Sequence, residues 1–453
     1  MSAKQAGRLM TQRRFWPLFV LLQSGTFNDN LLKNALIGMI TFGGVVFLAD
    51  LPSAIRVPVA GMIFTGPFLL VCAIAGQIAD KYDRAKILRN VKRAELLIML
   101  LTALGFWLGN FPMLVIALAG MGAQSAFFSP TKNAGLPQWL EEDELITGNA
   151  LLNGFVYVLV LVGMVFGLMM SDTSSDNPLI AEHGHNIIAC VLLFFAIIGW
   201  AASKFQTDAP APKPDLKINF EPVTATWSVL RTAFKAPPVL RPMLGIAWFY
   251  GLSTILITTL PNYVAEVMGY NSGVLINMLV ISTIGILIGS LLCMVLANGK
   301  RFGRESVGLT AIGITGVVLC TIGLYIYMPT EPVARIGGKL PGMAVFKQSE
   351  NAHLLLGLLF TASMFNGMFV VPLQAMAQRR ADPAIRARLM SAGSVLLNIF
   401  VNFFTFGLIW MAYQQLPPKT PFLAIIIISF FVMIYAIYRT INPHHYKSHV
   451  GED

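Results

Sequence analysis

Long apolar segments separated by short polar connections follow one another along the whole chain. A helix needs about 20 mainly apolar residues to cross the hydrocarbon core of a bilayer, and twelve segments come near that length. They cover approximately residues 15–42, 55–79, 87–108, 112–130, 145–170, 186–203, 240–265, 273–297, 306–328, 352–373, 389–414 and 420–438. The pattern predicts an all-α membrane protein with twelve transmembrane helices.

Composition and charge support this prediction. Apolar residues make up 56% of the chain and charged residues 12%, whereas a soluble domain is about a quarter charged. With the N-terminus placed in the cytoplasm, 26 of the 32 lysines and arginines fall in predicted inner segments and five in outer ones. This bias follows the positive-inside rule and predicts that both termini are cytoplasmic. The net charge of +10 is then a topology signal facing anionic lipid, and we expect no nucleic-acid partner.

The longest polar stretch, residues 204–240, contains six prolines and several lysines. We interpret it as a cytoplasmic linker in which residues 220–234 could form an interfacial amphipathic helix. It separates a predicted N-terminal six-helix half, residues 1–203, from a C-terminal six-helix half with a short cytoplasmic tail, residues 241–453.

The first span carries a polar face in otherwise apolar surroundings. At 100° per residue, one arc of roughly 140° holds Gln23, Thr26, Asp29, Asn30, Lys33 and Asn34, while Asn28 faces another direction. Asp29 and Lys33 are one turn apart and can pair. An ionisable group at mid-membrane costs about 2.5–3.5 kcal/mol or more, so this face is predicted to bind a substrate. The alternative is a structural polar seam between helices.

Most other polar residues in the spans are amides. The candidate substrate-binding set adds Gln124, Lys132, Asn149, Asn153, Asn366, Gln374, Asn398 and Asn402 to the polar face. Each amide alone could equally join two helices, at about 0.6 kcal/mol on average. Their concentration in the inner spans favours a shared cavity, whose many Phe and Met residues would suit the chain of an amphiphile.

Signatures of covalent catalysis and of metal binding are missing from the sequence. The four cysteines have no metal-like spacing, and no HExxH, HxxxxD, Walker A, GxSxG or Rossmann motif occurs. We therefore expect no catalytic residue, no metal and no cofactor, and a protein that is not an enzyme.

One connection resembles a known family signature. The stretch Gly76-Gln-Ile-Ala-Asp80-Lys-Tyr-Asp-Arg84-Ala-Lys is similar to the loop signature of the major facilitator superfamily, and a weaker copy follows span eight, with Asn298 in place of the Asp. The resemblance implies two six-helix halves and assigns conformational switching to Gly76, Asp80 and Arg84. An ordinary positive-inside loop is the alternative.

Three further motifs resemble the lysophospholipid transporter branch of that superfamily. They are Phe27-Asn-Asp-Asn30 in span one, Ser129-Pro-Thr-Lys132 at the end of span four and Phe369-Val-Val-Pro-Leu373 in span ten. The first is closest to the transporter half of transporter–acyltransferase fusions. Spans seven and eleven depart from the branch, with Ile257 and Val401 near positions where it has a basic and an acidic residue.

The resemblance implies a flippase in the inner membrane of a bacterium, and we expect it to act as a monomer and not as an enzyme. It would move lysophosphatidylethanolamine-like lipids by alternating access, with a separate acyltransferase as a further partner. Two alternatives stay open. One is an ion-coupled transporter of another lipophilic solute or drug, in which Asp29 carries a proton, and the other is a non-transporting scaffold or receptor.

Overall fold

A computed structural model describes residues 3–442, except 46, 49, 142–143, 174, 176, 212, 298–306 and 383–385. Helices dominate this part of the chain, and no β-strand occurs in it. The elements are α1 (Ala3–Met10), α2 (Trp16–Thr41), α3 (Ser53–Lys81), α4 (Arg84–Trp107), α5 (Phe111–Trp139), α6 (Leu145–Met170), α7 (Pro178–Ser203), α8 (Pro222–Phe234), α9 (Pro237–Asn262), the π-helical turn η1 (Tyr263–Val267), α10 (Ser272–Ala297), α11 (Val307–Tyr327), α12 (Met343–Phe346), α13 (Ala352–Arg380), α14 (Arg386–Tyr413) and α15 (Thr420–Ile441).

Each of the twelve predicted apolar segments falls on one long helix, and α8 forms inside the predicted linker. Within the described residues, nine helices are long and apolar enough to cross a membrane, as expected for a multi-pass membrane protein. Helices α2 and α4 are not among the nine, because polar and charged side chains interrupt their apolar character. The third long helix outside the nine is α6, in which Val158–Met170 forms a shorter apolar helix. Twelve crossings and cytoplasmic termini therefore remain predictions.

The starts of several helices follow from local sequence. Asp83 and Asn110 precede α4 and α5, and their side chains accept hydrogen bonds from the backbone N–H groups of Lys86 at 3.0 Å and Met113 at 3.1 Å. Such caps satisfy donors that the first helical turn leaves free. Proline in the first turn, which costs no hydrogen bond there, begins α2, α5, α7, α9 and α15.

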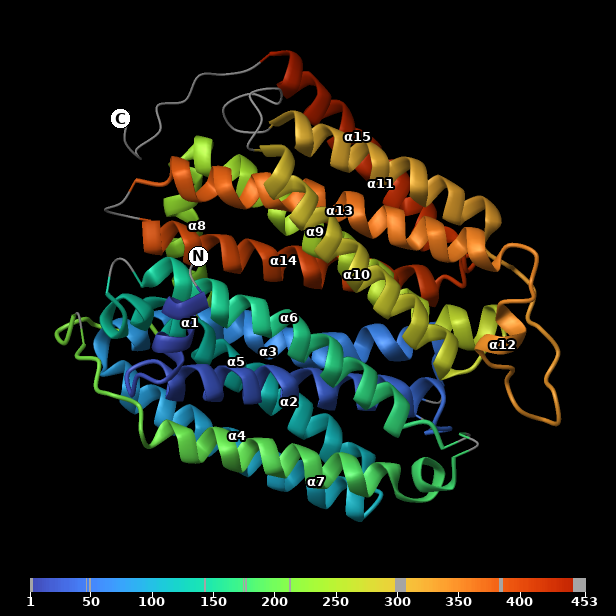
Figure 1. Ribbon diagram of the computed structural model, residues 1–453, viewed down its shortest axis with the longest axis horizontal. Coiled ribbons are helices and arrows are strands. Elements are labelled where there is room, and N and C mark those ends of the chain that lie inside the picture. The colour runs from blue at the N-terminus through green and yellow to red at the C-terminus, as the bar shows by residue number, and fades with distance from the viewer. Residues whose placement is uncertain are drawn as a thin grey trace. The chain divides into compact units, whose positions relative to one another are not determined.

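The chain clusters into two compact units. Unit one comprises Met1–Val46 and Ala60–Ser228, and unit two comprises Phe47–Val59 and Val229–Asp453. The same packing pattern occurs in both. In unit one, α2 packs on α6, and α4 packs on α5 and α7; in unit two, α9 packs on α14, and α11 packs on α13 and α15 (Figure 1). These pairs correspond with a shift of six predicted spans.

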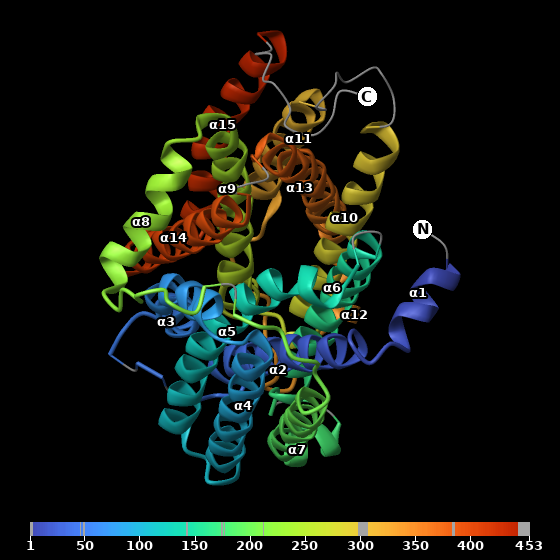
Figure 2. The same cartoon turned by 90° about the vertical axis from the view of Figure 1, so that its left-hand side faces the viewer.

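Helix α2 lies between α6 and α7 in unit one (Figure 2). Two glycines let the backbone of α6 come close to it. A Cβ atom at Gly163 would lie 2.8 Å from the carbonyl oxygen of Phe27, and one at Gly167 would lie 2.7 Å from that of Leu31. Small residues at such crossings allow close helix packing in membranes. This contact fixes the rotation of α2 and therefore the direction of its polar residues.

Candidate functional site

A fully buried ion pair lies on α4, at the centre of a polar group of side chains. Lys92 Nζ is 2.6 Å from Glu95 Oε2, and both side chains are 1% exposed. Glu95 accepts two further hydrogen bonds, from Asn28 Nδ2 at 3.3 Å and from Gln124 Nε2 at 3.2 Å. Lys92 also donates to Ser24 Oγ at 3.4 Å. We call these five residues, from α2, α4 and α5, the buried charge cluster.

Space for the lysine comes from two glycines on neighbouring helices. A Cβ atom at Gly25 of α2 would lie 2.9 Å from Lys92 Nζ, and one at Gly199 of α7 would lie 3.2 Å from it. The ring of Phe128 lies 5.5 Å from the same ammonium group. A side chain at Gly25 would therefore push against the ammonium group, and one at Gly199 would also approach Ser24 Oγ to 2.5 Å.

Hydrogen bonds of the cluster connect four helices of unit one, α2, α4, α5 and α7. Besides its bond to Glu95, Asn28 Nδ2 lies 3.3 Å from the carbonyl oxygen of Leu192 on α7. Removing two charges from water costs several kcal/mol per ion, which the Coulomb attraction offsets only when further hydrogen bonds satisfy the pair. Asn28 and Gln124 supply such bonds. Asn28 thus faces away from the polar arc of α2, as its helical position predicts.

Asp29 lies beside the cluster and is connected to it through one hydroxyl group. Ser125 Oγ is 2.9 Å from Asp29 Oδ2 and 3.3 Å from Gln124 Oε1. A serine hydroxyl has one proton, so it donates to one of these two oxygens at a time. The second carboxylate oxygen of Asp29 is buried and has no hydrogen-bond partner in the described structure.

Asp29 and Lys33, which the helical spacing allows to pair, make no direct ion pair in the described structure. The carboxylate of Asp29 is turned towards Ser125 on α5. Both side chains are half-buried. Helix α2 therefore presents two opposite charges, one turn apart, that do not neutralise each other by direct contact.

Several predicted amides bond to their own helices. Their side-chain N–H groups donate to carbonyl groups one turn earlier, Asn30 to Thr26, Asn34 to Asn30, Asn398 to Ser394 and Asn402 to Asn398, at 2.8–2.9 Å. Asn366 instead joins α13 to α9 through Ser253 Oγ at 3.4 Å. The local bonds orient each of these amide groups.

The remaining predicted site residues are placed as follows. Gln124 joins the buried charge cluster, Lys132 is half-buried on α5, and Gln374 is half-buried on α13. Asn149 and Asn153 belong to α6, but their side chains lie outside the described structure. Among the predicted substrate-binding residues on different helices, the structure brings Asp29 of α2 and Gln124 of α5 together, with Ser125 between them.

Lys92 and Glu95 are not among the site residues that the sequence predicts. Lys92 stands in a run of basic residues at the start of α4, which is typical of an inner topology signal, whereas the structure buries its side chain. One feature of the sequence indicates the ion pair. Glu95 is the only acidic residue of α4 and lies three positions after Lys92. Residues at this spacing share one face of a helix.

The predicted switching residues lie where α3 meets α4. Arg84 Nη2 is 3.6 Å from Asp80 Oδ1, and Arg84 Nε donates to the carbonyl oxygen of Ala79 at 3.2 Å. The weaker second copy of this loop falls on residues 298–306, outside the described structure. An added Cβ atom at Gly76 would meet nothing within 4 Å, so close packing does not require glycine there.

Hydrogen bonds join the linker to unit one near the connection between α3 and α4. Its backbone groups bond to α3, α4 and α5 through the pairs Asn219 with Gln77, Lys213 with Asp80, Ala209 with Arg84, Gln206 with Arg89, Pro210 with Gln138 and Thr207 with Trp139. An ion pair between Arg89 and Asp208 adds to them at 2.9 Å. A movement of the α3 end that carries Asp80 would therefore also displace the linker.

Comparison with known proteins agrees with this architecture. Curated relatives include the "Lysophospholipid transporter LplT" of Klebsiella pneumoniae, which is 25% identical over 335 residues and 73% of each chain. The protein of the same name from Salmonella gallinarum is 26% identical over 334 residues, covering 73% of this chain and 72% of that one.

Solved structures show the same fold at low sequence identity. A bacterial homolog of the human lysosomal transporter Spinster, in an inward-facing conformation, matches with a TM-score of 0.60 and 12% identity over 97% of this chain and 96% of that one. An auto-inhibited POT family peptide transporter matches with a TM-score of 0.61 and 12% identity over 98% and 99%. The family model described as Major Facilitator Superfamily matches residues 15–403. The prediction of a transporter fold is thus confirmed, and the chain belongs to the major facilitator superfamily.

Proposed function

We propose that this protein moves lysophospholipids, of the lysophosphatidylethanolamine type, across the inner membrane of a bacterium by alternating access of two six-helix halves. The observation that carries the proposal is the pair of opposite charges on α2. Asp29 and Lys33 are half-buried, one turn apart and not paired with each other. The name of the curated relatives supports the same substrate class.

The two charges suit a zwitterionic headgroup. Side chains one turn apart have Cβ atoms about 5–6 Å apart, a separation that a phosphoethanolamine group can bridge. Its ammonium group would bind the free carboxylate oxygen of Asp29, and its phosphate would bind Lys33. A ligand of this kind satisfies both charges in apolar surroundings, where each alone is costly.

The other predicted residues take supporting roles in this proposal. Amides of both halves would contact the headgroup and the glycerol, with Gln124 acting through Ser125; they are Asn30, Asn34, Asn149, Asn153, Asn366, Gln374, Asn398 and Asn402. Lys132 would meet the phosphate late in transport. Asp80 and Arg84 would control the exchange of conformations. The protein would act as a monomer with both termini in the cytoplasm, and a separate acyltransferase would use the delivered lysolipid.

Uptake by spheroplasts tests the proposal. Labelled lysophosphatidylethanolamine is compared with its diacyl counterpart for the wild type, Asp29→Asn, Lys33→Gln and the double variant. We expect each single change to abolish lysolipid uptake while the melting temperature in detergent stays near that of the wild type. Asp50→Asn and Lys217→Gln neutralise exposed charges and serve as matched controls. Wild-type uptake by a stable double variant would refute the proposal.

A second candidate function is ion-coupled transport of another lipophilic solute. The buried, unbonded oxygen of Asp29 favours it, because a carboxylate in such a place can take up a proton. In this case the wild type would not move lysolipid, and a proton gradient would drive Asp29-dependent uptake of a lipophilic dye. Both outcomes are read in the same spheroplasts.

A further inference from the structure

A groove in unit one lies apart from the polar face of α2. It runs along α4 and α5 beside the end of α3 and has a volume of about 770 Å³, within the range of about 300–1,000 Å³ for ligand pockets. Its lining consists of Ile78, Lys81, Tyr82, Asp83, Lys86, Ile87, Asn90, Val91, Ala94, Ile98, Gly120, Ala123, Gln124 and Phe127. Neither Asp29 nor Lys33 takes part.

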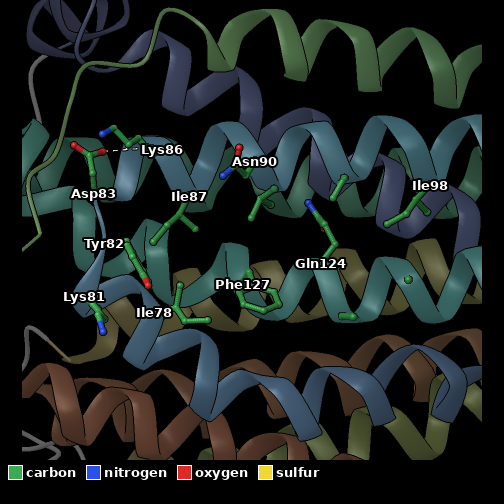
Figure 3. Close-up of a pocket in the computed structure, with 14 residues that line it drawn as sticks. Ile78, Lys81, Tyr82, Asp83, Lys86, Ile87, Asn90, Ile98, Gln124 and Phe127 are labelled. Atoms are coloured by element: carbon green, nitrogen blue, oxygen red, sulfur yellow. Dashed lines mark hydrogen bonds between the residues drawn. The ribbon is translucent and has the colours of Figure 1, made fainter. Parts of the chain in front are cut away.

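The groove is polar at one end and apolar along its length. Lys81, Tyr82, Asp83 and Lys86 gather at one end, and Ile98 lies towards the other (Figure 3). Between them the walls are formed mainly by aliphatic side chains and the ring of Phe127. An occupant must therefore combine a polar head with an apolar chain.

The polar end is net positive. Lys81 is half-buried and Lys86 is exposed, and neither takes part in a described ion pair. The one carboxylate, that of Asp83, accepts the backbone N–H of Lys86 at 3.0 Å and caps α4. Two lysine ammonium groups are thus available to a phosphate, with the hydroxyl of Tyr82 and the amide of Asn90 beside them.

The inner wall of the groove adjoins the buried charge cluster. Gln124 lines the groove, and its Nε2 donates to Glu95 Oε2. The other lining residues beyond the lysines are mainly aliphatic, so this part of the groove offers an acyl chain mainly apolar contacts. Basic pockets between transmembrane helices on the cytoplasmic side are typical binding places for phosphate-bearing lipid headgroups, and the lysine and arginine bias assigns this end to the cytoplasm.

We infer that this groove binds a glycerophospholipid of the surrounding membrane. Its phosphate lies between Lys81 and Lys86, and one acyl chain follows α4 and α5 towards Ile98. The bound lipid is a resident ligand of unit one and not the transported substrate. It holds the connection between α3 and α4, in which Asp80 and Arg84 form their ion pair.

Photolabelling of the purified full-length protein in detergent tests the site. The probe is phosphatidylglycerol with a diazirine in one acyl chain, and labelled peptides are identified by mass spectrometry. We expect labels concentrated in residues 87–98 and 120–127. The exposed outer face of α15, where Phe431 is 66% exposed, is the internal comparison. Equal labelling of both regions would overturn the proposal.

Variants separate the headgroup from the chain. Lys81→Gln with Lys86→Gln should lower labelling of the groove by at least about tenfold, in line with the usual effect of two lysines on anionic lipid binding. Lys217→Gln with Lys235→Gln removes two exposed lysines outside the groove and should not. Ala123→Phe should fill the groove and abolish labelling, with the melting temperature reporting on folding.

A neutral probe completes the test. Diacylglycerol with the same diazirine lacks the phosphate and should label the groove as weakly as phosphatidylglycerol labels the lysine variant. Equal labelling of the wild type by both probes, or wild-type labelling of the lysine variant, would refute phosphate recognition.

Discussion

Lys92 and Glu95 form an ion pair of 2.6 Å between two side chains that are each 1% exposed, three positions apart on α4. The pair carries no net charge, and Asn28 and Gln124 satisfy the carboxylate further. A pair of this kind does little for stability compared with apolar residues of similar size, but losing one partner leaves a buried charge alone. The cluster therefore makes the arrangement of α2, α4 and α5 sensitive to single substitutions.

Neutralising Glu95 should destabilise unit one. Glu95→Gln leaves Lys92 buried without a counter-charge, so we expect the free energy of unfolding to fall by about 3–5 kcal/mol. Denaturant unfolding in detergent measures the change. The double variant Lys92→Met with Glu95→Leu should recover most of the loss.

The exposed pair of Arg89 and Asp208 provides a control. Asp208 is 72% exposed, and exposed ion pairs contribute about 0–1 kcal/mol, so Asp208→Asn should unfold almost like the wild type. Wild-type stability of Glu95→Gln would contradict this prediction, because it would mean that water reaches Lys92.

Gly25 should not tolerate a side chain. The Cβ atom of Gly25→Ala would lie 2.9 Å from Lys92 Nζ and should lower the melting temperature. At Gly61 of α3 an added Cβ atom meets nothing within 4 Å, and alanine is favoured over glycine in a helix interior by about 1 kcal/mol. Gly61→Ala should therefore be neutral or stabilising, and a similar effect of both changes would contradict the close approach.

Ser125 should matter for transport through its hydroxyl group. Ser125→Ala removes the hydrogen bond to Asp29, a type worth about 1.5–3 kcal/mol when one partner is charged. We expect reduced lysolipid uptake, and rescue by Ser125→Thr. Ser290→Ala, which loses only a bond to its own helix at Ile286, should transport normally. Full activity of Ser125→Ala would exclude a role for this bond.

Asp80→Asn should shift the balance between inward- and outward-open states. Its ion pair with Arg84 joins the end of α3 to the start of α4, and the Asp80 side chain is 45% exposed. Exposed pairs contribute about 0–1 kcal/mol, so overall stability should change little. Accessibility labelling of single cysteines on each side reports the balance. Asp215→Asn, an exposed change in the linker, is the control, and identical labelling of both variants would refute a switching role.

Substitutions of Lys132 test whether transport needs only a positive charge at this position on α5 or the lysine itself. Lys132→Ala should abolish lysolipid uptake if the lysine meets the substrate phosphate or a partner carboxylate. Lys132→Arg keeps the charge and should restore uptake if the side chain only anchors the helix at the membrane surface. Normal uptake by Lys132→Ala would exclude both the phosphate and the partner roles.

The positions of the helices can be predicted from the sequence alone. Hydrophobicity and helix capping act over a few neighbouring residues, so the twelve apolar segments and the linker helix α8 can be read from local composition. The polar face of α2 and the direction of Asn28 follow from the same helical geometry. Motifs at Asp29, Asp80 and Lys132 were sufficient to indicate the family, which the matches confirm.

The contacts between polar groups depend on tertiary packing. Glu95 finds Asn28 at a separation of 67 residues and Gln124 at a separation of 29, and no local pattern encodes such contacts. Asp29 bonds to Ser125 and not to Lys33 for the same reason. Helix spacing alone allowed Asp29 to pair with Lys33. The glycines Gly163 and Gly167 bring α6 close to α2. This packing sets the rotation of α2, which turns the carboxylate of Asp29 towards α5.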